Sequence, residues 1–210
     1  MTAVARDERI WHTGWLRRMV IRPELGSVVG AIAVFGFFAA QSPVFRSADG
    51  VANWLDPAST LGIMAVAISL LMIGGEFDLS AGVLTGTCGL IVVTLATQAG
   101  WNVWAAMLAS LAVALLIGFL NGLLVVRTKL PSFIVTLGTF LMLQGLNLGV
   151  TKALTGTVQV GGLRDASGYE SAHAVFAGSV TIGGTDFRIA ILWWLAVTAI
   201  ATYVLTRTRP

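Results

Sequence analysis

The chain has 210 residues, of which 13 are basic and 10 acidic, so that 11% of it is charged and 56% is hydrophobic. An ordinary soluble domain is about 25% charged, and a chain this poor in charge cannot cover a globular surface with polar groups. The composition therefore disfavours a cytosolic enzyme, a disordered chain and a nucleic-acid binder, and it indicates a protein whose surface is covered mostly by membrane lipid.

The N-terminal segment, residues 1–24, holds five of the 13 basic residues. We expect it to be a cytoplasmic basic tail, which either lies on the inner leaflet through its apolar side chains or is unstructured. The apolar run after it is long for the core of a signal peptide and is followed by five more runs. We therefore expect this first run to remain as a membrane span.

Six apolar runs of about 17 to 25 residues are long enough to cross a bilayer as helices. They predict an all-α fold, a polytopic membrane helix bundle of about six transmembrane helices, with the first five helices in residues 25–151. The runs lie at residues 25–45, 57–75, 80–100, 101–126, 131–151 and 188–206. Residues 79–126 contain no charged side chain and are too many for one crossing, so we expect a turn at residues 98–100. Four of the five prolines flank these runs, which predicts proline at helix ends and not in helix interiors.

The distribution of Lys and Arg predicts the orientation of the bundle. With the N-terminus inside, nine of these residues lie on the cytoplasmic side and four on the opposite side. Cytoplasmic loops carry an excess of Lys and Arg, so we predict N-in and C-in termini. Five tryptophans fall near the expected outer ends of the spans, where they either form an interfacial belt or pack between helices. They are Trp54, Trp101, Trp104, Trp193 and Trp194.

Residues 152–187 are polar and glycine-rich, and we expect them to form an extracytoplasmic loop. Within this loop, Ser179–Ile182 and Thr185–Ile189 flank two glycines, a pattern typical of a β-hairpin with a two-residue turn. A soluble partner could dock on such a hairpin, whereas the alternative is a disordered connector. Residues 188–210 then form the sixth span and a short cytoplasmic end.

Polar residues at membrane depth are costly and are therefore candidates for function. Glu76 and Asp78 are the only acids in residues 57–126, and they lie beside two glycines between two apolar runs. The segment is either an exposed turn with its acids in water or a broken helix whose freed backbone groups and carboxylates line a cavity. Ser80 is placed to cap the following helix, where the helix dipole also favours Asp78.

A second group of polar residues lies on the fourth and fifth runs. It comprises Asn121, Thr136, Thr139, Gln144 and Asn147. We expect the hydroxyl and amide groups of the fifth run to share one helix face. Such a stripe suits a neutral, hydroxyl-rich solute, and it also suits hydrogen bonds between helices.

Small residues spaced four apart let helices approach closely and pack in a membrane. Four such glycine pairs predict a packed bundle: Gly26/Gly30, Gly82/Gly86, Gly118/Gly122 and Gly145/Gly149. The sequence contains no nucleophile motif, no phosphate-binding loop and no metal-ligand spacing. We therefore expect no catalytic residue and no metal site, and we expect that this chain does not hydrolyse ATP by itself.

Three stretches carry a further signal: GEFDLSAG at residues 75–82, GFLNGLLV at residues 118–125 and PSFIVTLGT at residues 131–139. Together they resemble bacterial ABC-importer permeases of the ribose/xylose type. Residues 75–82, GEFDLSAG, resemble the family signature GGIDLSVG, with Glu76 where many members have a second glycine. Residues 118–125, GFLNGLLV, resemble a GxxNGLLV stretch, and residues 131–139, PSFIVTLGT, resemble a PxFIVTLGT stretch. The stretches follow the family's order and spacing, and the similarity extends over most of residues 22–209.

The resemblance implies a permease subunit of an ATP-driven importer in the bacterial inner membrane, which binds no cofactor itself. The implied partners are membrane lipid, a cytoplasmic ABC ATPase subunit, an extracytoplasmic sugar-binding protein and a second permease subunit in a homodimer. By matching position, Asp78 and Ser80 belong to a broken-helix segment, and Asn121, Thr136 and Thr139 belong to helices near the central path. Family members usually continue into a cytoplasmic coupling loop and further spans, so we expect an N-terminal portion of such a permease.

The sequence thus predicts the membrane-spanning subunit of an ABC importer for a monosaccharide, a pentose or a similar simple sugar. The candidate translocation path comprises Glu76, Asp78, Ser80, Asn121, Thr136, Thr139, Gln144 and Asn147. Three alternatives stay open. They are an ABC permease for branched-chain amino acids or nucleosides, an ion-coupled carrier that uses the two acids, and a truncated fragment that does not transport.

Overall fold

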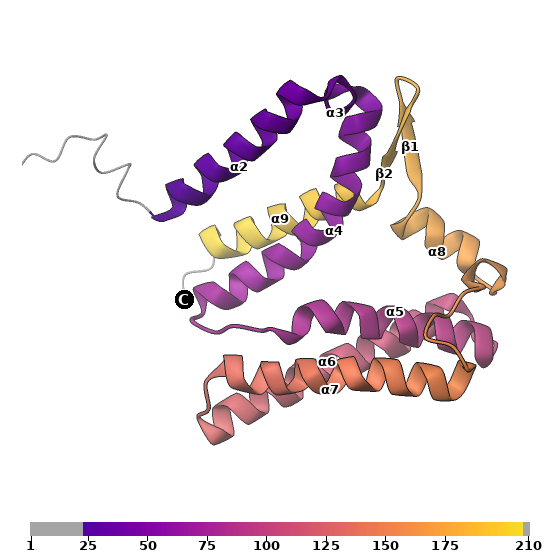
Figure 1. Cartoon of the computed structure of the whole chain (residues 1–210). Helices are drawn as coiled ribbons and strands as arrows, with labels where there is room; N and C mark the ends of the chain where they lie inside the picture. The colour runs from indigo at the N-terminus through magenta and orange to yellow at the C-terminus, as the bar shows by residue number, and fades with distance from the viewer. Residues whose placement is uncertain (1–22, 208–210) are drawn as a thin grey trace, which may run out of the picture. The chain divides into compact units, whose positions relative to one another are not determined.

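The computed structural model describes residues 23–207, which are mainly helical (Figure 1). In chain order the elements are α2 (Pro23–Gln41), α3 (Pro43–Arg46), α4 (Ala48–Ile73), α5 (Ser80–Gln98), α6 (Val103–Thr128), α7 (Ser132–Thr155), η1 (Leu163–Asp165), α8 (Tyr169–Phe176), β1 (Ser179–Ile182), β2 (Thr185–Arg188) and α9 (Ala190–Arg207). The chain divides into two compact units, residues 1–51 and residues 52–210. The predicted basic tail lies outside the described residues, apart from the two residues that begin α2.

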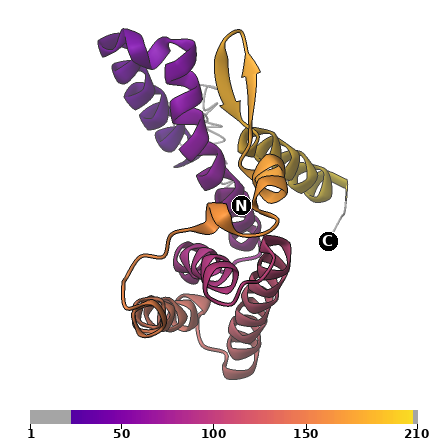
Figure 2. The same cartoon turned by 90° about the vertical axis from the view of Figure 1, so that its right-hand side faces the viewer.

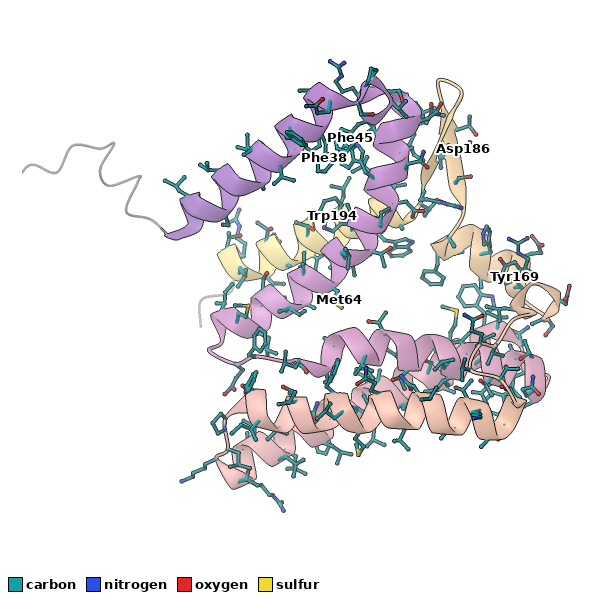
Figure 3. The ribbon with its side chains drawn as sticks, viewed as in Figure 1. Phe38, Phe45, Met64, Tyr169, Asp186 and Trp194 are labelled. Carbon is teal, nitrogen blue, oxygen red and sulfur yellow. The ribbon has the colours of Figure 1, made fainter. Side chains whose placement is uncertain are left out.

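The first unit contains α2, α3 and the first turn of α4. α2 ends because Ser42 adopts an extended backbone (φ −124°, ψ 111°) before Pro43, and proline disfavours a helical conformation in the residue before it. Ser42 then caps α3 by accepting a hydrogen bond from the Phe45 N–H at 3.2 Å. The rings of Phe38 and Phe45 pack with centroids 6.2 Å apart (Figure 3). The run predicted as one span at residues 25–45 is therefore a helix followed by a separate helical turn.

α4 begins at Ala48, earlier than the span that was predicted to begin at Pro57. Pro57 lies inside this helix, so the expectation that prolines lie only at helix ends is wrong at this position. The buried Ser59 hydroxyl donates a hydrogen bond to the Asp56 carbonyl at 2.7 Å, directly beside the proline. Side-chain hydroxyls are one of the means by which a membrane helix accommodates a proline.

In the second unit, α5 packs against both α6 and α7, and α6 contacts α7 (Figures 1 and 2). The chain reverses between α5 and α6 where the sequence predicts a turn. Gly100 adopts a left-handed backbone with φ +68°, and Asn102 caps α6 by accepting a hydrogen bond from the Trp104 N–H at 2.9 Å. Each of the three helices therefore contacts the other two, and together they form a small bundle (Figure 2).

Residues 163–188, which we call the loop cap, comprise η1, α8 and the two strands. The cap packs on α5 and α6 through a small apolar cluster in which Ala172 of α8 is buried with Ala96 and Val103. Tyr169 lies at the edge of this cluster (Figure 3). Small buried residues from three helices thus bring the loop into close contact with the membrane-length helices.

Two tryptophans bind the loop cap through their indole N–H groups. Trp104 of α6 donates to the Ser171 hydroxyl, and Trp193 of α9 donates to the Val175 carbonyl, each at 2.9 Å. The Phe176 ring lies 5.8 Å from Trp104 and 5.7 Å from Trp193, centroid to centroid. These two indole N–H groups are therefore bound within the protein, while both side chains stay about two-fifths exposed. The interfacial belt stays a prediction.

The two strands form an antiparallel hairpin at the predicted residues, with Ser179 opposite Arg188. Gly183 and Gly184 both have positive φ, +61° and +88°, the backbone that a tight two-residue hairpin turn requires. Arg188 also lies 3.5 Å from the carboxylate of Asp56 on α4, measured from Nε to Oδ2. This half-exposed ion pair connects the hairpin to α4.

Within residues 23–207, five helices are long and apolar enough to cross a membrane, namely α4, α5, α6, α7 and α9, and Leu25–Gln41 is a shorter apolar helix. Most of their large apolar side chains are exposed in this chain by itself, as expected for helices that face lipid or further protein. The predicted fold class, a mainly helical protein with about six apolar membrane helices, is confirmed. The N-in, C-in orientation stays a prediction.

The four predicted glycine pairs make no close helix contact within the described chain, so their role in helix packing stays a prediction. A Cβ atom added to any of these glycines would meet no atom within 4 Å: Gly26, Gly30, Gly82, Gly86, Gly118, Gly122, Gly145 and Gly149. A close approach occurs instead at Gly62 of α4, where an added Cβ would collide with the indole of Trp194 on α9 (Figure 3). The spacing of glycines thus did not identify the contact between α4 and α9, because that contact pairs a single glycine with an indole ring.

Candidate functional site: a buried polar junction

The candidate site begins at the break between α4 and α5. Gly74 and Glu76 donate their N–H groups to the carbonyls of Leu70 and Leu71, each at 3.2 Å, which closes the C-terminal end of α4. Gly75 adopts the left-handed backbone, φ +83°, that this closure requires. Residues 76–78 have no regular structure, and α5 begins at Ser80.

Two hydroxyl groups of α7 hold the broken segment. The Ser132 hydroxyl accepts a hydrogen bond from the Phe77 N–H at 3.0 Å, and the Thr136 hydroxyl accepts one from the Leu79 N–H at 3.1 Å. The two side chains lie one turn apart on α7 and therefore share a helix face. Backbone N–H groups that a broken helix leaves without intrahelical partners are thus satisfied by a neighbouring helix.

A second set of hydrogen bonds connects α7, α6 and α5, and in each bond the donor lies on the side of α7. The Thr139 hydroxyl donates to Oδ1 of Asn121 at 2.6 Å, and Nδ2 of Asn121 donates to the Ser80 hydroxyl at 3.2 Å. Ser80 in turn donates its hydroxyl and its backbone N–H to Oδ1 of Asp78, at 2.6 and 2.7 Å. The chain of donors therefore ends on a carboxylate, an acceptor that strengthens the bonds to it.

These six residues, Asp78, Ser80, Asn121, Ser132, Thr136 and Thr139, are here called the polar junction. Ser80 is fully buried, and Asn121, Thr136 and Thr139 are each less than a tenth exposed. Polar groups buried in this way are costly unless they are hydrogen-bonded, and the bonds above satisfy them mutually. The junction is therefore a closed connection between three helices, and the alternative of hydrogen bonding between helices describes it better than an open polar channel does.

Three of the predicted path residues lie outside the junction. Glu76 is exposed on the break, and Gln144 is exposed on α7. At ~100° per residue, Gln144 lies roughly 140° from Thr139 and roughly 80° from Thr136 around α7, so the shared polar face on this helix stays a prediction. Asn147 is half-buried and lines a cavity of about 480 Å³ between α5, α6 and α7 whose lining is otherwise mostly apolar.

Ser132 is the junction residue that sequence reasoning missed. It lies in the PSFIVTLGT stretch but was not among the candidate residues. Its position one turn before Thr136, at the first residue after a proline, is the signal that could have identified it. Among the described residues, no group of three or more His, Cys, Asp or Glu side chains is placed to hold a metal ion.

Residues 50–210 match the protein family described as "branched-chain amino acid transport system / permease component". The chain belongs to this permease family. Its members are transport permease components of the inner membrane that span it several times, they are not enzymes, and they bind no cofactor themselves. All six junction residues lie within the matched range.

Two curated relatives have names that specify a transported compound. The xylose transport system permease protein XylH of Escherichia coli (strain K12) is 33% identical over 129 residues, which is 61% of this chain and 33% of XylH. The autoinducer 2 import system permease protein LsrC of Salmonella typhi is 30% identical over 179 residues, 84% of this chain and 50% of LsrC. The chain thus spans at most about half the length of these relatives. No solved structure matches it.

Proposed function

We propose that this chain is the membrane-spanning permease part of an ATP-driven importer for a monosaccharide, a pentose or a similar simple sugar. The observation that carries the proposal is the convergence of the three motif stretches. Their polar residues come from α5, α6 and α7 and meet in one hydrogen-bonded junction at a helix break. Broken helices next to polar groups at membrane depth are typical of transport pathways.

The names of the relatives favour a sugar or a similar small solute as cargo. One is described as transporting xylose and the other as importing autoinducer 2. In this proposal the polar junction fixes the helices that border the path, and Glu76, Gln144 and Asn147 remain candidates for contact with the solute. A neutral, hydroxylated solute needs hydrogen-bonding groups along its path and no fixed charge of opposite sign.

The proposal includes partners for ATP hydrolysis, for delivery of the sugar and for completion of the path. A cytoplasmic ABC ATPase subunit hydrolyses ATP, an extracytoplasmic binding protein delivers the sugar, and a second copy of the permease completes the path as a homodimer. The role of this chain is to provide the membrane helices, with the N-terminus and the end of α9 on the cytoplasmic side. Transport then follows from alternation between outward-open and inward-open arrangements, driven by the ATPase.

The test is reconstitution of the complete gene product in proteoliposomes with its ATPase and binding protein. Binding protein loaded with xylose, ribose or arabinose should raise ATP hydrolysis above the rate with empty binding protein. The family description makes branched-chain amino acids the first comparison set, and nucleosides the second. If an amino acid or a nucleoside stimulates hydrolysis and no sugar does, the cargo proposal is wrong. Uptake that needs a membrane potential and no ATP would instead identify an ion-coupled carrier.

A further inference from the structure

The break between α4 and α5 is attached to a single face of α7. Ser132, Thr136 and Thr139 fall within roughly 60° of arc on that helix, at ~100° per residue. Ser132 and Thr136 bind the backbone of the break directly, while Thr139 reaches it through the side chains of α6 and α5. A shift of α7 relative to α5 would therefore disturb all the attachments together.

The Thr136 hydroxyl is oriented by its own helix. Its proton is donated to the Ser132 carbonyl at 2.8 Å, which leaves an oxygen lone pair for the Leu79 N–H at 3.1 Å. Thr136 is only 3% exposed, so water does not compete for either bond. A valine at this position would keep the shape of the side chain and lose both bonds, whereas a serine would keep both.

The two N–H groups that these hydroxyls bind belong to the break, where the backbone forms no helical hydrogen bonds. The N–H groups of Phe77 and Leu79 follow the last turn of α4 and precede α5, so no helical carbonyl lies in register for them. An unpaired N–H in apolar surroundings is costly. Without the two hydroxyls, the break would have to move until these groups reached water or another acceptor.

We infer that Ser132 and Thr136 are positioning residues for transport, because they hold the break against α7 and thereby fix where Glu76 and Asp78 lie. The consequence for transport rests on the proposed function, while the attachment itself does not. Neither hydroxyl needs to contact the solute. Their loss should slow the conversion between transport states and should leave the recognition of the loaded binding protein unchanged.

The first experiment measures the attachment without transport. Amide hydrogen exchange is followed for residues 77–80 in nanodiscs, in the unchanged protein and in Thr136→Val, Thr136→Ser and Ser132→Ala. Loss of the part-buried bond should make the Leu79 amide exchange roughly tenfold faster in Thr136→Val. The bond from Phe77 is exposed, so the increase at Phe77 in Ser132→Ala should be smaller. Thr136→Ser should exchange as the unchanged protein does.

The matched control is Thr202→Val on α9. The Thr202 hydroxyl donates only to the Thr198 carbonyl of its own helix and is exposed, so the same chemical change removes no contact between elements. Exchange at residues 77–80 should be unchanged in this control. Equal exchange in Thr136→Val and in the unchanged protein would overturn the attachment.

The second experiment measures transport in the complete reconstituted importer. Thr136→Val should lower the maximal rate of sugar uptake roughly tenfold, in line with the loss of one buried bond, and should leave the KM for loaded binding protein unchanged. Thr136→Ser should restore the rate. Normal uptake in Thr136→Val despite faster exchange would overturn the positioning role. If the unchanged protein takes up no sugar, the cargo proposal fails, and the exchange data still decide whether the attachment exists.

Discussion

The N-terminal and C-terminal ends of α5 are attached to the rest of the second unit by different chemistry. At the N-terminal end, the polar junction uses hydroxyls, an amide and one carboxylate that are joined in a chain of hydrogen bonds. Near the C-terminal end, the loop cap packs through Ala96, Val103 and Ala172 and is fixed by two indole N–H groups. The first attachment depends on a chain of bonds, whereas the second is spread over apolar contacts and single bonds.

This difference predicts how each end responds to substitution. Removing one member of a buried polar chain leaves its neighbours without partners, so the loss exceeds that of one bond. Removing one bond of the loop cap leaves the apolar contact in place. The junction should therefore be sensitive to single changes, and the cap should weaken in small steps.

The largest effect is expected for Asn121→Leu, which removes the central member of the junction. Thr139 loses its acceptor and Ser80 loses a donor, both at buried positions. Ser80 keeps its bond to Asp78, and Thr139 can still donate to the Val135 carbonyl at 3.3 Å. The loss of two buried hydrogen bonds should therefore lower the free energy of unfolding by about 1–3 kcal/mol. The measurement is denaturation in detergent micelles followed by the helical circular dichroism signal.

Gln144→Leu is the matched control, because it makes the same change at an exposed amide on α7. Its effect should be within about 0.5 kcal/mol. If Gln144→Leu destabilised the protein as much as Asn121→Leu does, the closed junction would be the wrong description and the predicted stripe on α7 would gain support.

The next effect is expected at the loop cap, in Gly168→Ala. Gly168 has φ +82°, and an added Cβ would lie 2.7 Å from the side-chain oxygen and nitrogen of Asn102, the cap of α6. The left-handed backbone alone costs a residue with a Cβ about 1–2 kcal/mol, and the crowding adds to that. Faster amide exchange in α8 is the expected result.

Gly161→Ala serves as the control in the same loop, since an added Cβ there meets no atom within 4 Å and φ is not positive. Exchange in α8 should be nearly unchanged by it. Equal protection of α8 in both variants would show that the cap does not depend on the close approach of Gly168 to α6.

Sequence patterns predicted the polar end of α5 better than they predicted the cap end. Asp78, Ser80, Asn121, Thr136 and Thr139 were all identified, because motif stretches mark positions where polar groups recur at membrane depth. The structure adds that they bind one another. This could not be read from the sequence, since a hydroxyl that faces a solute and one that faces a neighbouring helix have the same spacing.

Other features depended on contacts between distant segments. The hairpin was predictable because two adjacent glycines determine a tight turn locally. Pro57 within α4 was not, because a neighbouring hydroxyl and the membrane length of the helix outweigh the local preference of proline. The contact of Gly62 with Trp194 was missed for the same reason, since it pairs residues far apart in the chain.

A smaller effect is expected for Trp193→Phe, which keeps the aromatic contact with Phe176 and removes the indole N–H bound to the Val175 carbonyl. The loss should be about 0.5–1.5 kcal/mol in the local stability of α8, the usual contribution of one hydrogen bond. Hydrogen exchange of the α8 amides measures it. Trp101→Phe, at a ring that is 45% exposed, is the control and should leave α8 unchanged.

The smallest effect is expected for Asp56→Asn, which removes one charge from the ion pair between α4 and the hairpin. Both partners are nearly half exposed, at 47% and 44% for Arg188 and Asp56, and pairs this exposed contribute about 0–1 kcal/mol. The Arg188 guanidinium also donates to the Ala177 carbonyl at 3.2 Å, so the hairpin keeps that bond. Exchange of the hairpin amides should rise slightly at low salt and match the unchanged protein at high salt, because salt screens the pair.

Asp165→Asn, at an exposed acid of the same loop, should show no salt-dependent difference. A large loss of protection in Asp56→Asn at low salt that disappears at high salt would mean that the cap is held by its charges, and the contrast between the two ends of α5 would then fail.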